Sequence, residues 1–324
     1  MERERTERMS RIRHVEARGI TSLLRRFGLV VAFAVLVAAL SFLSDSFLTV
    51  SNLLNIARQV SINAIIAAGM TFVILTGGID LSVGSVLAFT GAIMAGLLSS
   101  GRPLLAGIGG GLTLGALLGL VNGVVITKGK VQPFIATLAM LTIARGTTLV
   151  YTDGRPITGL PDTFVWLGAG EVARIPVPVL MMAIVFLASY VVLTQTVFGR
   201  YVYAIGGNEE AARLSGVNVT SYKALVYVIS SLLSAISAII LTGRLNSAQP
   251  TAGFAFELDA IAAVVLGGTT LAGGEGGIGG TLLGAFIIGV LNNGLNLLNV
   301  SSFYQQVTKG AVILLAVLLD RRLR

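Results

Sequence analysis

The sequence predicts an all-α protein, a polytopic membrane bundle of about ten transmembrane helices. The composition is 54% hydrophobic and 12% charged, whereas soluble domains carry about 25% charged residues. Apolar runs of membrane-spanning length recur from one end of the chain to the other. The 40 glycines fit this class, because small residues let helices approach closely in lipid. A transmembrane β-barrel would show segments of alternating hydrophobicity, and these runs are continuous.

The apolar runs place the expected spans in order along the chain. They cover residues 27–43, 60–76, 83–98, 103–126, 133–150, 176–193, 224–241, 258–267, 278–298 and 305–319. Between the first two, the semi-polar stretch 44–59 is expected at the outer interface, and 243–257 is a second semi-polar stretch. The spans form a single transmembrane domain, 27–320, and a count of about eight spans is the alternative.

The charges predict which side of the membrane each end occupies. Residues 1–26 hold eight Arg and four Glu, and the last five residues hold three Arg and one Asp. An even number of spans puts both ends on one side, and basic flanks favour the cytoplasmic side. We therefore expect a cytoplasmic Arg-rich tail, 1–26, a cytoplasmic end, 321–324, and the acidic loop 152–174 outside. A nucleic-acid partner is the weaker interpretation of the basic ends, and none is expected.

Several functional classes are excluded by the residues that the chain lacks. It has no cysteine, and its single histidine, His14, lies in the polar tail, so thiolate or histidine metal sites are not expected. No P-loop motif occurs. Residues 274–279 match G-x-G-x-x-G, but Asn299 stands where an acid should follow about 20 residues on. We expect no cofactor, no metal and no catalytic residue, hence not an enzyme.

The central polar segment, 199–223, predicts a short helix presented to the cytoplasm. Asn208 is a good N-cap, and carboxylates in the next turn suit the helix dipole. Ser215-Gly216 supplies a stop signal, and Gly206-Gly207 is expected to form a tight turn. Such a helix suits the docking of a partner; the alternative is an ordinary solvated loop. The candidate docking residues are Gly206, Gly207, Asn208, Glu209, Glu210, Arg213, Leu214, Ser215 and Gly216.

Polar side chains inside apolar segments are functional candidates, because they are costly in a bilayer. Asp80 and Ser82 lie between two spans, where capping of the next span is preferred over substrate contact. Arg145 needs a partner or a water-filled face. Amides both donate and accept hydrogen bonds, as a neutral polyhydroxylated solute requires, although hydrogen bonding between helices is the alternative for each one. The candidate path residues are Asn63, Asp80, Ser82, Asn122, Arg145, Asn292, Asn293 and Asn296.

Four long motifs, taken together, resemble a known family. They are GMTFVILTGGIDLSVGSVLA (69–88), YAIGGNEEAARLSGVNV (203–219), SAQPTAGFAFELDAIAAVVLGGTTLAGGEG (247–276) and GVLNNGLNLLNVSSFYQQVTKGAVILLAVLLD (289–320). They are similar to the ribose-type permease subunits of bacterial ABC sugar importers, in the branched-chain amino acid/ribose permease superfamily. The resemblance runs from Phe47 to Asp320. Glu275 and Gly277 stand where ribose permeases carry basic residues, so the motifs indicate the family more firmly than the sugar. Segments 73–84 and 264–274 also echo each other, as transporter repeats do.

The resemblance implies a division of labour among several subunits. A separate ATPase would dock at the central segment, 199–223, as its coupling contact. A periplasmic sugar-binding protein would meet the outer stretches, and a second permease copy would complete the path across a bacterial inner membrane. The implied substrate is ribose or a similar pentose; a nucleoside, a furanosyl signal or a branched-chain amino acid is the same-fold alternative. An ion-coupled secondary transporter is disfavoured, because the carboxylates lie near predicted span ends rather than at mid-bilayer.

Overall fold

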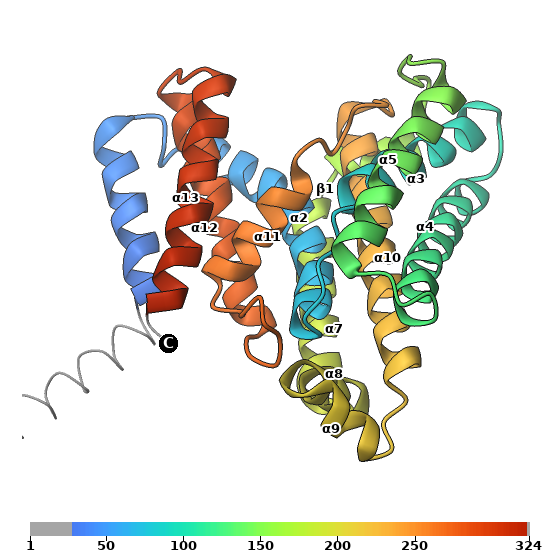
Figure 1. Ribbon diagram of the computed structural model, residues 1–324. Coiled ribbons are helices and arrows are strands. Elements are labelled where there is room, and N and C mark those ends of the chain that lie inside the picture. The colour runs from blue at the N-terminus through green and yellow to red at the C-terminus, as the bar shows by residue number, and fades with distance from the viewer. Residues whose placement is uncertain (1–27, 323–324) are drawn as a thin grey trace, which may run out of the picture.

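The computed structural model describes residues 28–322, and over this range the protein is almost entirely helical (Figure 1). A first helix covers Gly28–Leu43. The further helices are α2 (Val50–Leu75), α3 (Val83–Ser99), α4 (Leu104–Thr127), α5 (Pro133–Thr152), α6 (Asp162–Ala169), α7 (Val177–Gln195), α8 (Val197–Gly207), α9 (Glu209–Leu214), α10 (Val219–Leu245), α11 (Phe256–Leu266), α12 (Ile278–Leu297) and α13 (Ser302–Arg322). The strands β1 (Glu171–Val172) and β2 (Ile175–Pro176) form a short antiparallel hairpin.

Within the described range, six helices are long and apolar enough to cross a membrane: α2, α4, α5, α7, α10 and α12. The first helix and α3 are shorter apolar helices. The prediction of a polytopic helical membrane protein is therefore confirmed. The count of about ten spans stays a prediction. The Arg-rich tail, 1–26, lies outside the described residues.

Helix α2 forms the centre of the bundle. From Val60 to Leu75 its residues are buried apart from Asn63, which is partly exposed. It packs against α10, α12, α11 and α7. Close approach depends on small residues: a Cβ built on Gly69 would lie 2.9 Å from the Cα atom of Ser230 on α10. The α2–α10 contact is thus a backbone approach of the kind that small residues permit in membranes.

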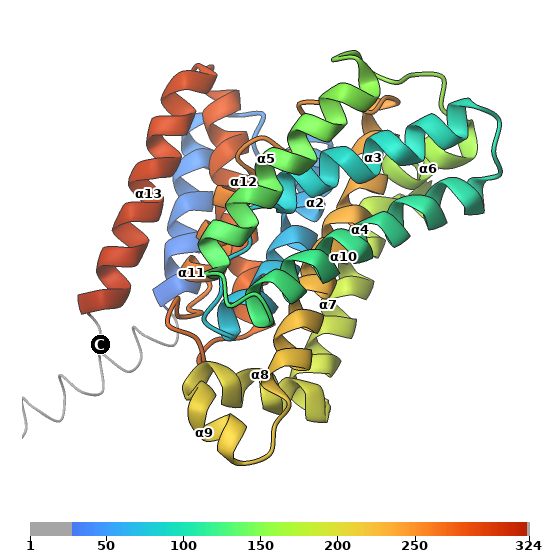
Figure 2. The same cartoon turned by 45° about the vertical axis from the view of Figure 1, so that its right-hand side comes forward.

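Different elements lie at the two ends of the bundle (Figure 1). Helices α8 and α9 lie together at one end, and the start of the first helix and the end of α13 point toward that same end. The connection from α5 to α6 lies at the opposite end. Figure 2 shows α3 and α4 slanting across α10, with α5 beside α3. The ends of the described chain therefore share a side with the central polar segment.

One boundary differs from the expectation. The span expected at 60–76 starts earlier, because α2 begins at Val50 and continues without a break to Leu75. The interfacial position of 44–59 stays a prediction. Thr49 caps this helix, with its side chain accepting from the backbone N–H of Asn52 at 3.4 Å. No glycine or proline interrupts residues 50–68, so the helix continues past the polar residues in this stretch.

Candidate functional site

Three polar stretches meet at the end of the bundle opposite α8 and α9. Arg58 on α2 forms an ion pair with Glu171 on β1. Ile157 and Ala248 exchange backbone hydrogen bonds of 3.1 and 2.9 Å. These contacts join the stretches 44–59, 152–174 and 243–257. The stretches 44–59 and 152–174, which the sequence assigned to the outer side, are therefore linked to each other and to the semi-polar stretch 243–257.

The break between α2 and α3 holds a buried carboxylate. One oxygen of Asp80, Oδ1, accepts from the backbone N–H and the hydroxyl of Ser82 at 3.0 and 2.6 Å. The other oxygen accepts from the Ser230 hydroxyl on α10 at 2.8 Å. Asn122 of α4 donates to the Ser82 hydroxyl oxygen at 3.0 Å. All four residues are buried, so this cluster ties the start of α3 to α4 and α10.

Arg145 of α5 finds its partners in backbone carbonyls. Its Nη1 donates to the oxygens of Pro250 and Ala252 at 2.9 and 2.7 Å. The guanidinium thereby holds the loop between α10 and α11.

The three asparagines of α12 differ in their hydrogen-bond partners. Asn293 is buried and exchanges two side-chain hydrogen bonds, of 3.0 and 2.8 Å, with Asn52 of α2. Asn296 is exposed and accepts from Gln305 at 2.8 Å. Asn292 keeps a buried Oδ1 without a partner among the described residues. Asn292 and Asn296 lie four residues apart on α12 and so share a helix face, whereas Asn293 belongs to a contact between helices.

A residue that the sequence analysis missed, Lys309, connects three helices. Its ammonium lies 2.9 Å from Oδ2 of Asp259 on α11. The same oxygen accepts from Nδ2 of Asn63 on α2 at 3.4 Å. The Asp259 side chain is 6% exposed and that of Lys309 is 27% exposed. A lysine inside the apolar run 305–319 was the available signal, because an intramembrane charge needs a partner.

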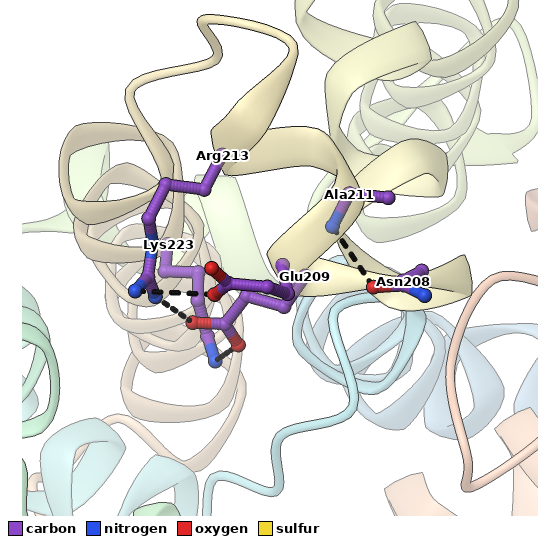
Figure 3. A network of polar contacts seen from close by, with 6 residues as sticks. Asn208, Glu209, Ala211, Arg213 and Lys223 are labelled. Carbon is purple, nitrogen blue, oxygen red and sulfur yellow. Dashed lines mark hydrogen bonds and ion pairs between the residues drawn. The ribbon is translucent and has the colours of Figure 1, made fainter.

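Helix α9 is capped and charged as the sequence predicted (Figure 3). Oδ1 of Asn208 accepts from the backbone N–H of Ala211 at 2.9 Å. Glu209 forms ion pairs with Arg213 at 3.3 Å and with Lys223 of α10 at 2.9 Å. The Lys223 side chain is only 14% exposed. Glu209 therefore fixes the short helix to the start of α10.

The stop signal is also confirmed, but the expected turn is wrong. Ser215 ends α9, and Gly216 follows with φ +87°. Gly206 and Gly207 are instead the last residues of helix α8. Gly206 serves close packing, because a Cβ there would lie 1.8 Å from the carbonyl oxygen of Leu75. Sequence alone does not separate these two uses of glycine.

A cavity of about 450 Å³ lies beside α9, between the α4–α5 connection and the start of α10. Its charged lining residues are Lys130, Glu209, Arg213 and Lys223. Basic side chains outnumber acidic ones in this lining. The exposed tip of α9 adds an apolar side chain, since Leu214 is 81% exposed. This end of the molecule thus offers a concave, basic surface next to an apolar one.

The comparisons with known proteins agree with this architecture. The family described as branched-chain amino acid transport system / permease component matches residues 52–317. The chain belongs to this family. It is therefore a membrane permease component and not an enzyme, as the motifs predicted. No solved structure matches it.

Relatives of this permease cover nearly its whole length. The ribose import permease protein RbsC of Haemophilus influenzae is 56% identical over 90% of this chain and 92% of its own. The protein of the same name from Bacillus subtilis is 57% identical over 92% of this chain and 94% of its own. The D-allose transport system permease protein AlsC of Escherichia coli is 41% identical over 91% of each chain.

Proposed function

We propose that this chain is the transmembrane permease subunit of a bacterial ABC importer for ribose. The observation that carries the proposal is the 56–57% identity to ribose import permeases over about nine-tenths of both chains. The relatives named for D-allose and for L-arabinose are less similar, at 41% and at 40% or less. A ribose importer is thus favoured over an importer of a related sugar.

In this proposal a separate ATPase docks at α8 and α9. The sequence has no P-loop, so the energy of ATP must come from another subunit. The ion pairs of Glu209 hold α9 in one orientation, which lowers the entropic cost of docking. The exposed Leu214 and the basic cavity beside it supply an apolar anchor and charge complementarity to an acidic partner surface.

Two further partners are a periplasmic binding protein, at the end of the bundle opposite α8 and α9, and a second copy of the permease. A periplasmic binding protein loaded with sugar meets the surface formed by 44–59, 152–174 and 243–257. A second copy of the permease completes the path in the cytoplasmic membrane, with both termini inside. Exposed or partly exposed polar side chains remain the candidates for the path: Asn63, Arg145, Asn292 and Asn296. The buried Asp80, Ser82, Asn122 and Asn293 are better suited to anchoring helices.

A competition assay tests the substrate. Proteoliposomes with the permease, its ATPase and its binding protein take up labelled ribose in the presence of an excess of unlabelled competitor. We expect ribose to abolish the signal, and allose, arabinose, a nucleoside and leucine to leave most of it. Stronger competition by any of these than by ribose would assign the importer to that solute instead.

A further inference from the structure

Three backbone segments that lie far apart in the sequence meet at one point next to α8. The N–H of Gly274, in the loop after α11, donates a 3.0 Å hydrogen bond to the carbonyl oxygen of Leu75 at the end of α2. Gly206 of α8 lies against both groups. A Cβ on Gly206 would stand 1.8 Å from the Leu75 oxygen and 2.4 Å from the Gly274 nitrogen. No side chain fits there, so the three backbones touch directly.

Neighbouring contacts extend this junction along the glycine-rich loop. A Cβ on Gly273 would lie 2.8 Å from the Gly77 nitrogen and 3.1 Å from the Cα atom of Gly206. The Tyr203 hydroxyl of α8 donates to the carbonyl oxygen of Gly276 at 2.9 Å. Desolvation raises the pKa of Tyr203, so the hydroxyl keeps its proton. Gly273 and Gly276 have φ values of +90° and +132°, a conformation that favours glycine.

The junction joins the partner-facing helices to two breaks in the bundle. One break, 76–82, separates α2 from α3 and carries the Asp80 cluster; the other, 267–277, separates α11 from α12. Helix α9 follows α8 with only Asn208 between them. A displacement of α9 therefore reaches α8 and, through direct backbone contact, both breaks together. Close-packed contacts transmit such shifts, because no flexible side chain absorbs them.

We propose that the junction of Gly206 with Leu75 and Gly274 transmits motion of α8 and α9 to the loops 76–82 and 267–277, with Gly206 as its positioning residue. The inference rests on the proposed function, in which an ATPase moves α9. It goes further by naming the atoms through which that motion enters the transmembrane bundle. Residue 206 must lack a Cβ, because only then can the three backbone segments stay in direct contact.

The chain offers a matched control for this idea. Gly109 also lies in a helix, α4, but a Cβ on it would have no heavy atom within 4 Å, and it belongs to neither the docking surface nor the candidate path. Gly206→Ala and Gly109→Ala both replace a helical glycine by a better helix former. Only the first pushes a methyl group into the junction. Tyr203→Phe is a milder third variant, since it removes a single hydrogen bond and adds no atom.

The experiment compares these variants with wild type in proteoliposomes with ATPase and binding protein. It measures ATPase recovered with the permease, hydrolysis with and without ribose-loaded binding protein, and ribose uptake. We expect Gly206→Ala to retain the ATPase, to lower uptake by about tenfold and to lose the stimulation of hydrolysis. Gly109→Ala should match wild type, and Tyr203→Phe should lower uptake by about twofold to threefold.

Equal behaviour of the two glycine variants would overturn the proposal, and so would unchanged uptake and stimulation in Gly206→Ala. If Gly206→Ala does not accumulate in the membrane, Tyr203→Phe decides, and wild-type uptake and stimulation in it would reject the junction. Failure of the proposed function has a different signature: the wild type itself would show no ribose uptake. Loss of stimulation in Gly206→Ala with whichever solute the wild type transports would still support the junction.

Discussion

Lys309 of α13 lies 2.9 Å from Asp259 of α11, and this pair joins two helices at a point where Asn63 of α2 also binds the carboxylate. Removing one partner of a buried ion pair leaves an uncompensated charge, whereas replacing both removes the problem. We therefore expect the pair to hold α11 and α13 together.

Lys309→Met is predicted to destabilise the protein by about 3 kcal/mol, because Asp259 then stays buried without its cation. The double variant Lys309→Met/Asp259→Leu should recover most of that loss. Thermal unfolding of the purified protein in detergent compares the two. A single variant as stable as wild type would show that the pair contributes nothing to holding α13.

The hydrogen bonds around Asp80 allow a test of whether this residue anchors helices or contacts the substrate. Ser230→Ala removes one of the hydrogen bonds to the carboxylate and should cost about 1.5 kcal/mol of stability. Asp80→Ala leaves several buried donors unpaired and should cost more. Unfolding curves give the order of stability. A path residue would behave differently: Asp80→Ala would leave stability intact and raise the ribose concentration needed for half-maximal uptake.

Glu209 and Glu210 form a natural pair for testing the docking helix. Glu209 bridges Arg213 and the nearly buried Lys223, whereas Glu210 forms one ion pair among the described residues, with Arg213, and is 65% exposed. Glu209→Gln should weaken recovery of the ATPase with the permease by about fivefold, because two modest ion pairs are lost. Glu210→Gln should have little effect. Equal recovery with both variants would show that the orientation of α9 does not depend on Glu209.

A stripe of buried glycines runs along α4, at positions 107, 111, 115, 119 and 123. The first two face α3, and the last three pack against α10. A Cβ on Gly119 would lie 2.5 Å from the backbone carbonyl oxygen of Tyr227, whereas one on Gly109 would meet nothing within 4 Å. Gly119→Ala should destabilise by about 1–3 kcal/mol. Gly109→Ala should be neutral or stabilise by up to about 1 kcal/mol. Thermal unfolding checks the pair, and similar losses in both would argue against close α4–α10 packing.

The sequence predicted the helices well because the bilayer imposes a length on apolar runs. The runs 83–98 and 278–298 became α3 and α12 almost to the residue. The start of α2 was harder to predict. The polar side chains of 44–59 are typical of an interfacial segment, so the span was expected from residue 60, whereas α2 begins at Val50. The sequence shows how polar a stretch is, but its packing in the folded protein decides whether that stretch is helical.

Among the candidate site residues, those that act through local contacts were predictable, and those that act through distant contacts were not. Asn208, Ser215 and Gly216 were predictable because caps act locally. Gly206 was assigned to a turn, since its contacts with Leu75 and Gly274 come from residues far away in the sequence. Lys309 was overlooked for a related reason: its partner, Asp259, lies 50 positions away. Long-range partners of this kind are visible only in the folded chain.

We propose that this permease moves ribose only with the help of an ATPase and a binding protein. The most direct test is the initial rate of ribose uptake into proteoliposomes with ATP sealed inside, omitting each component in turn. We predict uptake with the full set and none when the ATPase, the binding protein or ATP is missing. Uptake by the permease alone, driven by a sodium or proton gradient, would contradict it.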